Sequence, residues 1–391
     1  MKNIRTRADL AVNGAAPAFD QTLHVGRPNM GDREAFMQYA ADIFDRRWLS
    51  NNGPLVQEFE AEVARHLGVK HCVAMCNGTI ALEIAIRALG LEGEVIVPSY
   101  TFVATAHALQ WQSITPVFAD VDPLTHTLSP AAVRRMITPR TSGIIGVHLW
   151  GRGAPVAELQ DIADEHGLKL MFDAAHAFSC TYQGRMIGSF GACEVLSFHA
   201  TKFFNTFEGG AVVTNDDALA EAMRLMRNFG FADLDKVIHP GTNGKMIEIA
   251  AAMGLVNLRS LDDVIAANRR NYMAYRESLR GIDGVRLLEY DEGERNNYQY
   301  VVLEVDDGCA ASRDTLVAAL RAENVFARRY FWPGCHNMEP YRSLFPHAGL
   351  VLPATDAVAR SVVVLPTGQT MDPDMIATVA QIIRTAVGAP A

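Results

Sequence analysis

The chain has 391 residues, of which 49% are hydrophobic and 20% are charged, and its formal net charge is −9. This length and composition predict a large buried core divided between two or more lobes, which excludes an intrinsically disordered protein. The negative charge disfavours nucleic acid as a partner, because the surface as a whole repels phosphate backbones, although a local basic pocket can still attract a small anion.

Short apolar runs in the first part of the chain predict buried strands. They cover residues 71–75, 94–97, 115–120, 142–148, 169–173, 195–199 and 211–214. Helical patterns lie between most of them, as at 79–89 and 154–166. This alternation predicts an α/β lobe with a mostly parallel sheet covered on both faces, which we place within residues 1–250 together with an N-terminal arm.

The remaining sequence predicts a smaller α+β lobe over residues 251–391. Residues 245–279 read as long helical stretches with Gly281 as a stop, followed by strand-like YQYVVLEV, a helical pattern at 312–323 and strand-like SVVVLP. No run of about 18 apolar residues occurs, so we expect a cytoplasmic protein without a membrane partner. The cysteines form no paired C-x-x-C clusters, so we expect reduced, buried thiols and no metal site.

Lys202 is the first candidate for catalysis. It lies in SFHATKFFNTFEGG, close to the end of a predicted buried strand. Desolvation lowers the pKa of a lysine and makes its amine available to attack an aldehyde and form a Schiff base. The alternative is an ordinary lysine whose stem covers apolar surface while its ammonium reaches water.

Asp173 is the second candidate, because it ends the strand-like run KLMFD. Ligands of open parallel sheets bind at the carboxyl ends of strands, and a buried carboxylate there needs a cationic partner. The pyridinium nitrogen of pyridoxal phosphate is such a partner. Asp173 can equally be the cap of a following helix.

Further residues at the predicted strand ends suit a phosphate and an aromatic ring. Gly78 and Thr79 open a helix directly after a strand and Ser197 adds a hydroxyl, although a plain strand-to-helix turn is the alternative. Phe102 is a candidate for stacking on a cofactor ring, or else ordinary core. His176 is a candidate contact to the ring hydroxyl, or else a core histidine satisfied by backbone.

Taken together, these motifs resemble the DegT/StrS family of nucleotide-sugar aminotransferases, which have the aspartate aminotransferase fold (fold type I). The resemblance runs through SNNGPLVQEFE, CNGTIAL, PSYTFVATA, VHLWG, FDAAHAF, SFHATKFFNTFEGG and RRYFWPGCHNMEPY. It implies pyridoxal 5'-phosphate as cofactor, bound as a Schiff base to Lys202, with Asp173 on the pyridine nitrogen. It also implies Gly78, Thr79 and Ser197 around the phosphate, with Phe102 and His176 against the ring.

Two positions depart from the commonest pattern of the family. Many members have Gln in place of His176 and an Asn-x-Arg-Met motif where this chain has Asn243-Gly244-Lys245-Met246. In the family that asparagine reaches the cofactor phosphate of the neighbouring subunit, so Asn243 implies a homodimer with shared active sites. Lysine keeps the charge of arginine without its planar fork.

The resemblance also implies a reaction. The segments around Lys202 and at 328–341 look most like members that aminate carbon 4 of a dTDP-linked 4-keto-6-deoxy sugar. We therefore expect L-glutamate as donor and dTDP-4-dehydro-6-deoxy-D-glucose as acceptor, with Lys245, Arg329 and Tyr330 as candidate substrate-binding residues.

Other functions remain open from the sequence. A 3-keto nucleotide sugar or a different ketone or aldehyde is the main alternative acceptor. A desulfurase would use Cys335 as its reactive cysteine. A nicotinamide enzyme would need a G-x-G-x-x-G after an early strand, which we do not find, and a binding protein could retain the fold without turnover.

Overall fold

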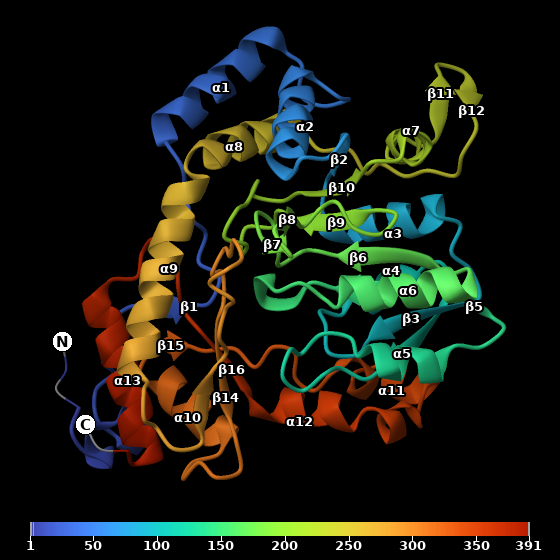
Figure 1. Cartoon of the computed structure of the whole chain (residues 1–391). Helices are drawn as coiled ribbons and strands as arrows, with labels where there is room; N and C mark the ends of the chain where they lie inside the picture. The colour runs from blue at the N-terminus through green and yellow to red at the C-terminus, as the bar shows by residue number, and fades with distance from the viewer. Residues whose placement is uncertain (1, 3, 390–391) are drawn as a thin grey trace.

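A seven-stranded sheet forms the centre of the computed structural model, which describes residue 2 and residues 4–389 (Figure 1). The strand order is β2-β10-β9-β6-β5-β3-β4, and β10 runs in the opposite direction to the other six strands. The sequence predicted a mostly parallel sheet, and this is confirmed. The strands are β2 (His71–Met75), β3 (Glu94–Pro98), β4 (Thr115–Ala119), β5 (Thr141–Val147), β6 (Lys169–Asp173), β9 (Glu194–Ser197) and β10 (Gly210–Thr214).

Helices cover both faces of this sheet because its strands are apolar on both sides. In β2, Cys72 and Ala74 join the core on one face, whereas Val73 and Met75 join the core on the other. The first core is shared with α2 (Pro54–Leu67), α5 (Pro130–Met136), α6 (Val156–His166) and α8 (Glu248–Arg259). The second is shared with α3 (Gly78–Ala88), α4 (Ala104–Gln110) and α7 (Asp217–Met226).

A second lobe is built on an antiparallel sheet in the order β13-β14-β16. Its buried cluster joins β14 to three helices through side chains such as Leu303, Leu316, Tyr275 and Ile383. The elements are β13 (Val285–Leu287), β14 (Val301–Val305), β16 (Val362–Leu365), α9 (Leu261–Ser278), α10 (Arg313–Ala322) and α13 (Pro373–Val387). The smaller α+β lobe expected from the sequence is therefore present.

The remaining elements are short or lie at the edges of the two lobes. The longest of them is α1 (Arg33–Arg46), which packs against α8. The others are α11 (Tyr341–Leu344), α12 (Pro353–Ser361), β7 (Thr181–Tyr182), β8 (Arg185–Met186), β11 (Phe231–Asp233), β12 (Lys236–Val237) and 3-10 turns at Arg7–Asp9, Ala11–Asn13, Leu149–Gly151, Cys335–Asn337 and Ala348–Val351.

The N-terminal arm packs on the second lobe, although it is far from that lobe in sequence. Its strand β1 (Leu23–His24) pairs in parallel with β15 (Val325–Phe326). The carboxylate of Glu323 accepts hydrogen bonds from the backbone N–H groups of Ala11 and Ala18, both at 2.6 Å, and pairs with Lys2 at 3.1 Å. These contacts fix the arm against the start of β15.

The division at residue 250 stays a prediction, and packing leads us to propose a different boundary. The helical stretch predicted at 245–279 is two helices, α8 and α9, which meet at Ser260. α8 packs against α1 and α2 of the large lobe, whereas α9 packs against α13 of the small lobe. We therefore propose that the lobes divide at Ser260.

Candidate active site

A cavity of about 320 Å³ opens at the carboxyl edge of the large sheet. Three of its lining residues stand at the ends of strands: Val147 closes β5, Asp173 closes β6 and Ser197 closes β9. Because these strands run parallel, their ends meet at one edge. Lys202 lines the same cavity, so the structure brings together the two candidates that the sequence analysis singled out.

Asp173 carries a buried carboxylate with a fixed orientation. Its Oδ2 accepts a hydrogen bond from the Thr105 hydroxyl at 2.8 Å, and its Oδ1 accepts one from the Ala175 N–H at 3.1 Å. Burial raises the pKa of Asp173, while these two hydrogen bonds and the charges of Lys202 and His148 oppose the rise. Such a carboxylate is best stabilised by a cation placed in the cavity.

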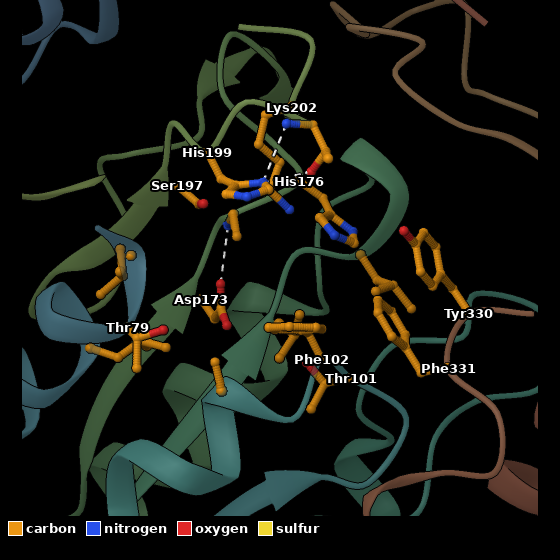
Figure 2. A pocket seen from close by; sticks show the side chains of 18 of the residues that line it. Thr79, Thr101, Phe102, Asp173, His176, Ser197, His199, Lys202, Tyr330 and Phe331 are labelled. Atoms are coloured by element: carbon orange, nitrogen blue, oxygen red, sulfur yellow. Dashed lines mark hydrogen bonds between the residues drawn. The ribbon is translucent and has the colours of Figure 1, made fainter. Parts of the chain in front are cut away.

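Lys202 is partly exposed at the cavity wall, and desolvation by the surrounding protein lowers the pKa of its ammonium to about 8, while the charge of Asp173 acts to raise it. A substantial fraction of its amine is therefore neutral near physiological pH, which a nucleophile or a proton acceptor requires. Because the side chain is partly exposed, a role in holding a cofactor stays a prediction, and the alternative of an ordinary lysine whose ammonium reaches water stays open. Figure 2 shows Lys202 and Asp173 in the same pocket.

The start of α3 forms one side of the cavity, together with Ser197 (Figure 2). Asn77 caps this helix, since its Oδ1 accepts a hydrogen bond from the Ile80 N–H at 2.8 Å. The first N–H groups of a helix lack partners within the helix, so those of Gly78 and Thr79 are available to an anion. A Cβ on Gly78 would lie 3.1 Å from the Ser197 Cβ, which explains the need for glycine at this close approach.

Aromatic side chains form the opposite side, with Tyr330 and Phe331 across the pocket from Thr79 (Figure 2). The reading of Phe102 as ordinary core is wrong, because its side chain lines the cavity and is 57% exposed. The His176 ring lies against the rings of both Trp150 and Phe331, with centroids 5.8 Å and 5.9 Å away, and these two rings also contact each other. Burial lowers the pKa of His176 well below its usual value, and the charge of Lys202 lowers it further, so the ring is neutral.

The Nδ1 atom of His176 is buried and, within the described part of the chain, has no hydrogen-bond partner. A core histidine satisfied by backbone would not leave this nitrogen unpaired. A buried polar atom without a partner next to a cavity points to a group that fills the cavity.

Three candidates lie outside the cavity of their own chain. Asn243 is exposed on the segment that follows the β11–β12 hairpin, and the ammonium of Lys245 lies 4.7 Å from the Phe229 ring centroid. Arg329 is paired with Asp314 at 2.9 Å in an adjoining hollow. A contribution of Asn243 to a neighbouring subunit stays a prediction, and so does substrate binding by Lys245 and Arg329.

Several residues of the cavity were not predicted from the sequence, including Thr101, His199, Glu208, Tyr300, Arg328 and Phe331. A buried chain of hydrogen bonds beneath the aromatic side was not predicted either. The Trp150 indole donates to His126 Nδ1 at 3.2 Å, and His126 Nε2 lies 2.7 Å from Glu304 on β14 of the small lobe. These three residues are far apart in the sequence and meet only in the folded structure, so no local sequence pattern predicts the chain of hydrogen bonds.

Cys335 is unsuited to be a reactive loop cysteine. Its thiol is buried and donates to the Thr101 carbonyl at 3.5 Å, and burial raises its pKa to about 12. This disfavours the desulfurase reading. No helix among the described residues is long and apolar enough to cross a membrane, and they contain no group of three His, Cys, Asp or Glu side chains that could hold a metal ion.

Known proteins similar to this chain agree with the geometry of the cavity. The sequence profile of the DegT/DnrJ/EryC1/StrS aminotransferase family matches residues 31–384. The dTDP-4-amino-4,6-dideoxy-D-glucose transaminase of Escherichia coli is 36% identical over 365 residues, which cover 93% of this chain and 98% of the relative. The GDP-perosamine synthase of Caulobacter vibrioides is also 36% identical, over 82% of this chain and 87% of its own length.

Two solved structures extend the similarity to the whole fold. DesI, crystallised in the presence of its TDP-sugar product, is 51% identical with a TM-score of 0.93, over 97% of this chain and 96% of DesI. The 3-amino-5-hydroxybenzoic acid synthase is 28% identical with a TM-score of 0.85, over 93% of this chain and all of that synthase (100%).

Proposed function

This chain belongs to the DegT/DnrJ/EryC1/StrS aminotransferase family, and from that premise we propose that it transfers the amino group of L-glutamate to carbon 4 of a nucleotide-linked keto sugar with pyridoxal 5'-phosphate as cofactor. The observation that carries this proposal is that Asp173 and Lys202 line one cavity with the start of α3 in its wall. The acceptor that we favour is dTDP-4-dehydro-6-deoxy-D-glucose, because the most similar relatives named above are a dTDP-sugar transaminase and DesI.

The cavity offers groups suited to the phosphate, the pyridine nitrogen and the ring face of pyridoxal phosphate. Gly78, Thr79 and Ser197 would hold the phosphate, and Asp173 would pair with the protonated pyridine nitrogen. Phe102 and His176 would contact the ring. Lys202 would be the point of covalent attachment.

When bound, the cofactor supplies an electron-withdrawing ring that stabilises negative charge on the carbon from which a proton is removed. The amine of Lys202 accepts the α-proton of glutamate and later delivers a proton to carbon 4 of the sugar. The carboxylate of Asp173 is held in place by hydrogen bonds from Thr105 and Ala175. In that position it stabilises the positive charge on the pyridine nitrogen throughout the reaction. Asp173 is buried and Lys202 lies on the wall of the same cavity, a position that limits the access of water to the proton transfer.

We further propose that the enzyme is a homodimer. α1 and the β11–β12 hairpin lie along the upper edge of the molecule in Figure 1. These elements and the segment after α1 carry exposed large apolar side chains, including Phe44 at 79% and Leu234 at 89% exposure. Such exposure is typical of a surface covered by a partner. A second copy would cover these side chains, and its Asn243 would approach the phosphate of the first.

The reaction is tested by offering purified enzyme, pyridoxal phosphate and glutamate a panel of dTDP-, UDP- and GDP-linked keto sugars. We expect one 2-oxoglutarate for each 4-amino-6-deoxy sugar formed from the dTDP-linked 4-keto sugar, with the position of the amine read by NMR. Turnover only with a 3-keto sugar, or with a ketone that carries no nucleotide, would favour the alternative acceptors instead.

The pKa of Lys202 gives a prediction for cofactor capture by the apoprotein. Desolvation lowers this pKa to about 8, and only the neutral amine attacks an aldehyde, so the reactive fraction rises with pH up to about 8 and then levels. Stopped-flow absorbance of apoprotein mixed with pyridoxal phosphate should show the capture rate rising about tenfold per pH unit between pH 6 and 7. A rate that still rises steeply through pH 10 would contradict a desolvated Lys202.

A further inference from the structure

The buried indole of Trp150 lies behind the aromatic wall of the cavity. It contacts three rings that line the cavity, those of His176, Tyr300 and Phe331, with centroids 5.8 Å, 5.3 Å and 5.6 Å from its own. His176 comes from the large lobe, whereas Tyr300 and Phe331 come from the small lobe. Since a packed interior transmits displacement, the orientation of this one indole determines where the three rings stand.

A hydrogen bond fixes the polar edge of this indole. The Nε1–H of Trp150 donates to Nδ1 of His126 at 3.2 Å. An indole N–H can only donate, so Nδ1 of His126 carries no proton. The proton of the neutral ring is therefore on Nε2, which donates to Oε1 of Glu304 at 2.7 Å. The chain of hydrogen bonds has one direction, from Trp150 through His126 to Glu304.

The far end of this chain belongs to the small lobe and reaches the surface. Glu304 is on β14, and its carboxylate pairs with the guanidinium of Arg286 on β13. The side chain of Glu304 is 11% exposed, whereas that of Arg286 is 55% exposed. A charge-assisted hydrogen bond to such a carboxylate is stronger than one between neutral groups. The orientation of the large-lobe residue His126 is thus fixed by a charged group of the small lobe.

The backbone adds a second, independent observation. Trp150 and His126 both lie in the left-handed region, with φ of 61° and 63°. Non-glycine residues seldom adopt this conformation, which persists where surrounding contacts impose it and which gathers at functional sites. At Trp150 those contacts include the hydroxyl of Tyr290, which donates to the Trp150 carbonyl at 3.0 Å. Two such residues joined by a hydrogen bond indicate that the orientation of the indole is what the fold maintains here.

We propose that His126 is a positioning residue of this site, which holds the Trp150 indole and thereby orients His176 against the cofactor ring. This inference rests on the proposed function and adds a residue that is not among those lining the cavity. Ring contacts have little directionality, so an indole without its hydrogen bond can turn while it stays buried. The atom that this would displace is Nδ1 of His176, which is buried and has no partner within the described chain.

The test compares His126→Leu with His126→Asn in the holoenzyme. Leucine removes the acceptor of the Trp150 hydrogen bond, whereas asparagine offers an amide oxygen near the position of Nδ1 and tolerates the left-handed backbone. The readout is the circular dichroism of the visible band of bound pyridoxal phosphate, which depends on how the ring is held. We expect the amplitude to change about twofold or more in His126→Leu and to return most of the way to wild type in His126→Asn.

Kinetics separate a positioning role from a loss of substrate binding. Because His126 contacts no substrate, His126→Leu should lower kcat about tenfold or more and leave KM for glutamate within about twofold. The matched control is Tyr275→Phe, which removes a buried hydrogen bond of 3.0 Å to the Pro366 carbonyl in the small-lobe core, away from the residues that line the cavity. Its dichroism and kcat should stay within about twofold of wild type although it also loses stability.

Trp150→Phe breaks the same hydrogen bond from the other side and carries the test if His126→Leu does not fold. Phenylalanine keeps a ring next to His176 but has no N–H, so we expect the same change in dichroism, and the losses of kcat should not add in the double variant. Dichroism and kcat in both single variants equal to those of Tyr275→Phe would overturn the positioning role and leave the proposed function standing. A wild-type chain that binds no pyridoxal phosphate would overturn both.

Discussion

Replacing Lys202 with alanine is expected to lower kcat for amino transfer by at least about 10⁴-fold. The substitution removes the amine that attaches the cofactor and moves the proton, and the other side chains of the cavity offer no second amine. The phosphate side of the site is untouched, so the variant should still bind pyridoxal phosphate. The visible absorbance of the covalently attached cofactor should be lost, and this is read by spectrophotometry alongside a coupled 2-oxoglutarate assay.

The matched control is Lys169→Ala. Lys169 begins β6, the strand that ends in Asp173, and its side chain is exposed at the opposite end of the strand from the cavity. We expect this variant to retain wild-type activity and absorbance. Comparable activity in Lys202→Ala and Lys169→Ala would show that Lys202 has no role in the reaction.

Asp173→Asn is expected to lower kcat by about 10²- to 10⁴-fold. Asparagine keeps the shape of the side chain and its contact with Thr105, but it carries no charge to hold a cation in the cavity. Because phosphate binding does not depend on Asp173, the loss should fall mainly on kcat, with a smaller change in cofactor affinity. Steady-state kinetics at saturating glutamate and keto sugar measure it.

A cofactor analogue with carbon in place of the pyridine nitrogen can be combined with Asp173→Asn to test whether the two changes act on the same interaction. If Asp173 acts through that nitrogen, the analogue should slow the wild-type enzyme about as much as the substitution does, and the two losses should not add. Losses that multiply would show that Asp173 acts on something other than the ring nitrogen.

The strand ends of the large sheet could be predicted because apolar runs that stop at a polar residue are local patterns. Asp173 closes β6, as expected, whereas β9 ends at Ser197, two residues before the predicted end at 199, and parallel pairing puts both residues at one edge. The direction of β10 was not predictable in this way. A strand of the same composition fits the sheet in either direction, so its composition does not predict the antiparallel pairing with β2. The sequence also does not show that the backbone at Gly210 lies against Asn77 and Gly78, at the start of α3.

What the sequence did not reveal depends on contacts between distant segments. The N-terminal arm pairs with β15 across about 300 residues, and Trp150 contacts the small lobe through the chain of His126 and Glu304 and through the ring of Tyr300. Asn243 is exposed in the single chain, so its proposed contact with a neighbouring subunit is visible neither in the sequence nor in one copy of the structure.

We propose above that the amine of Lys202 holds the cofactor opposite Asp173, and chemical trapping of the attached cofactor tests this most directly. Holoenzyme should be treated with borohydride, digested and analysed by peptide mass spectrometry. We predict that the phosphopyridoxyl mass is found on Lys202, in the peptide that contains HATKFFNTFEGG. A stable label on another lysine, or no label in protein that binds the cofactor, would contradict the account.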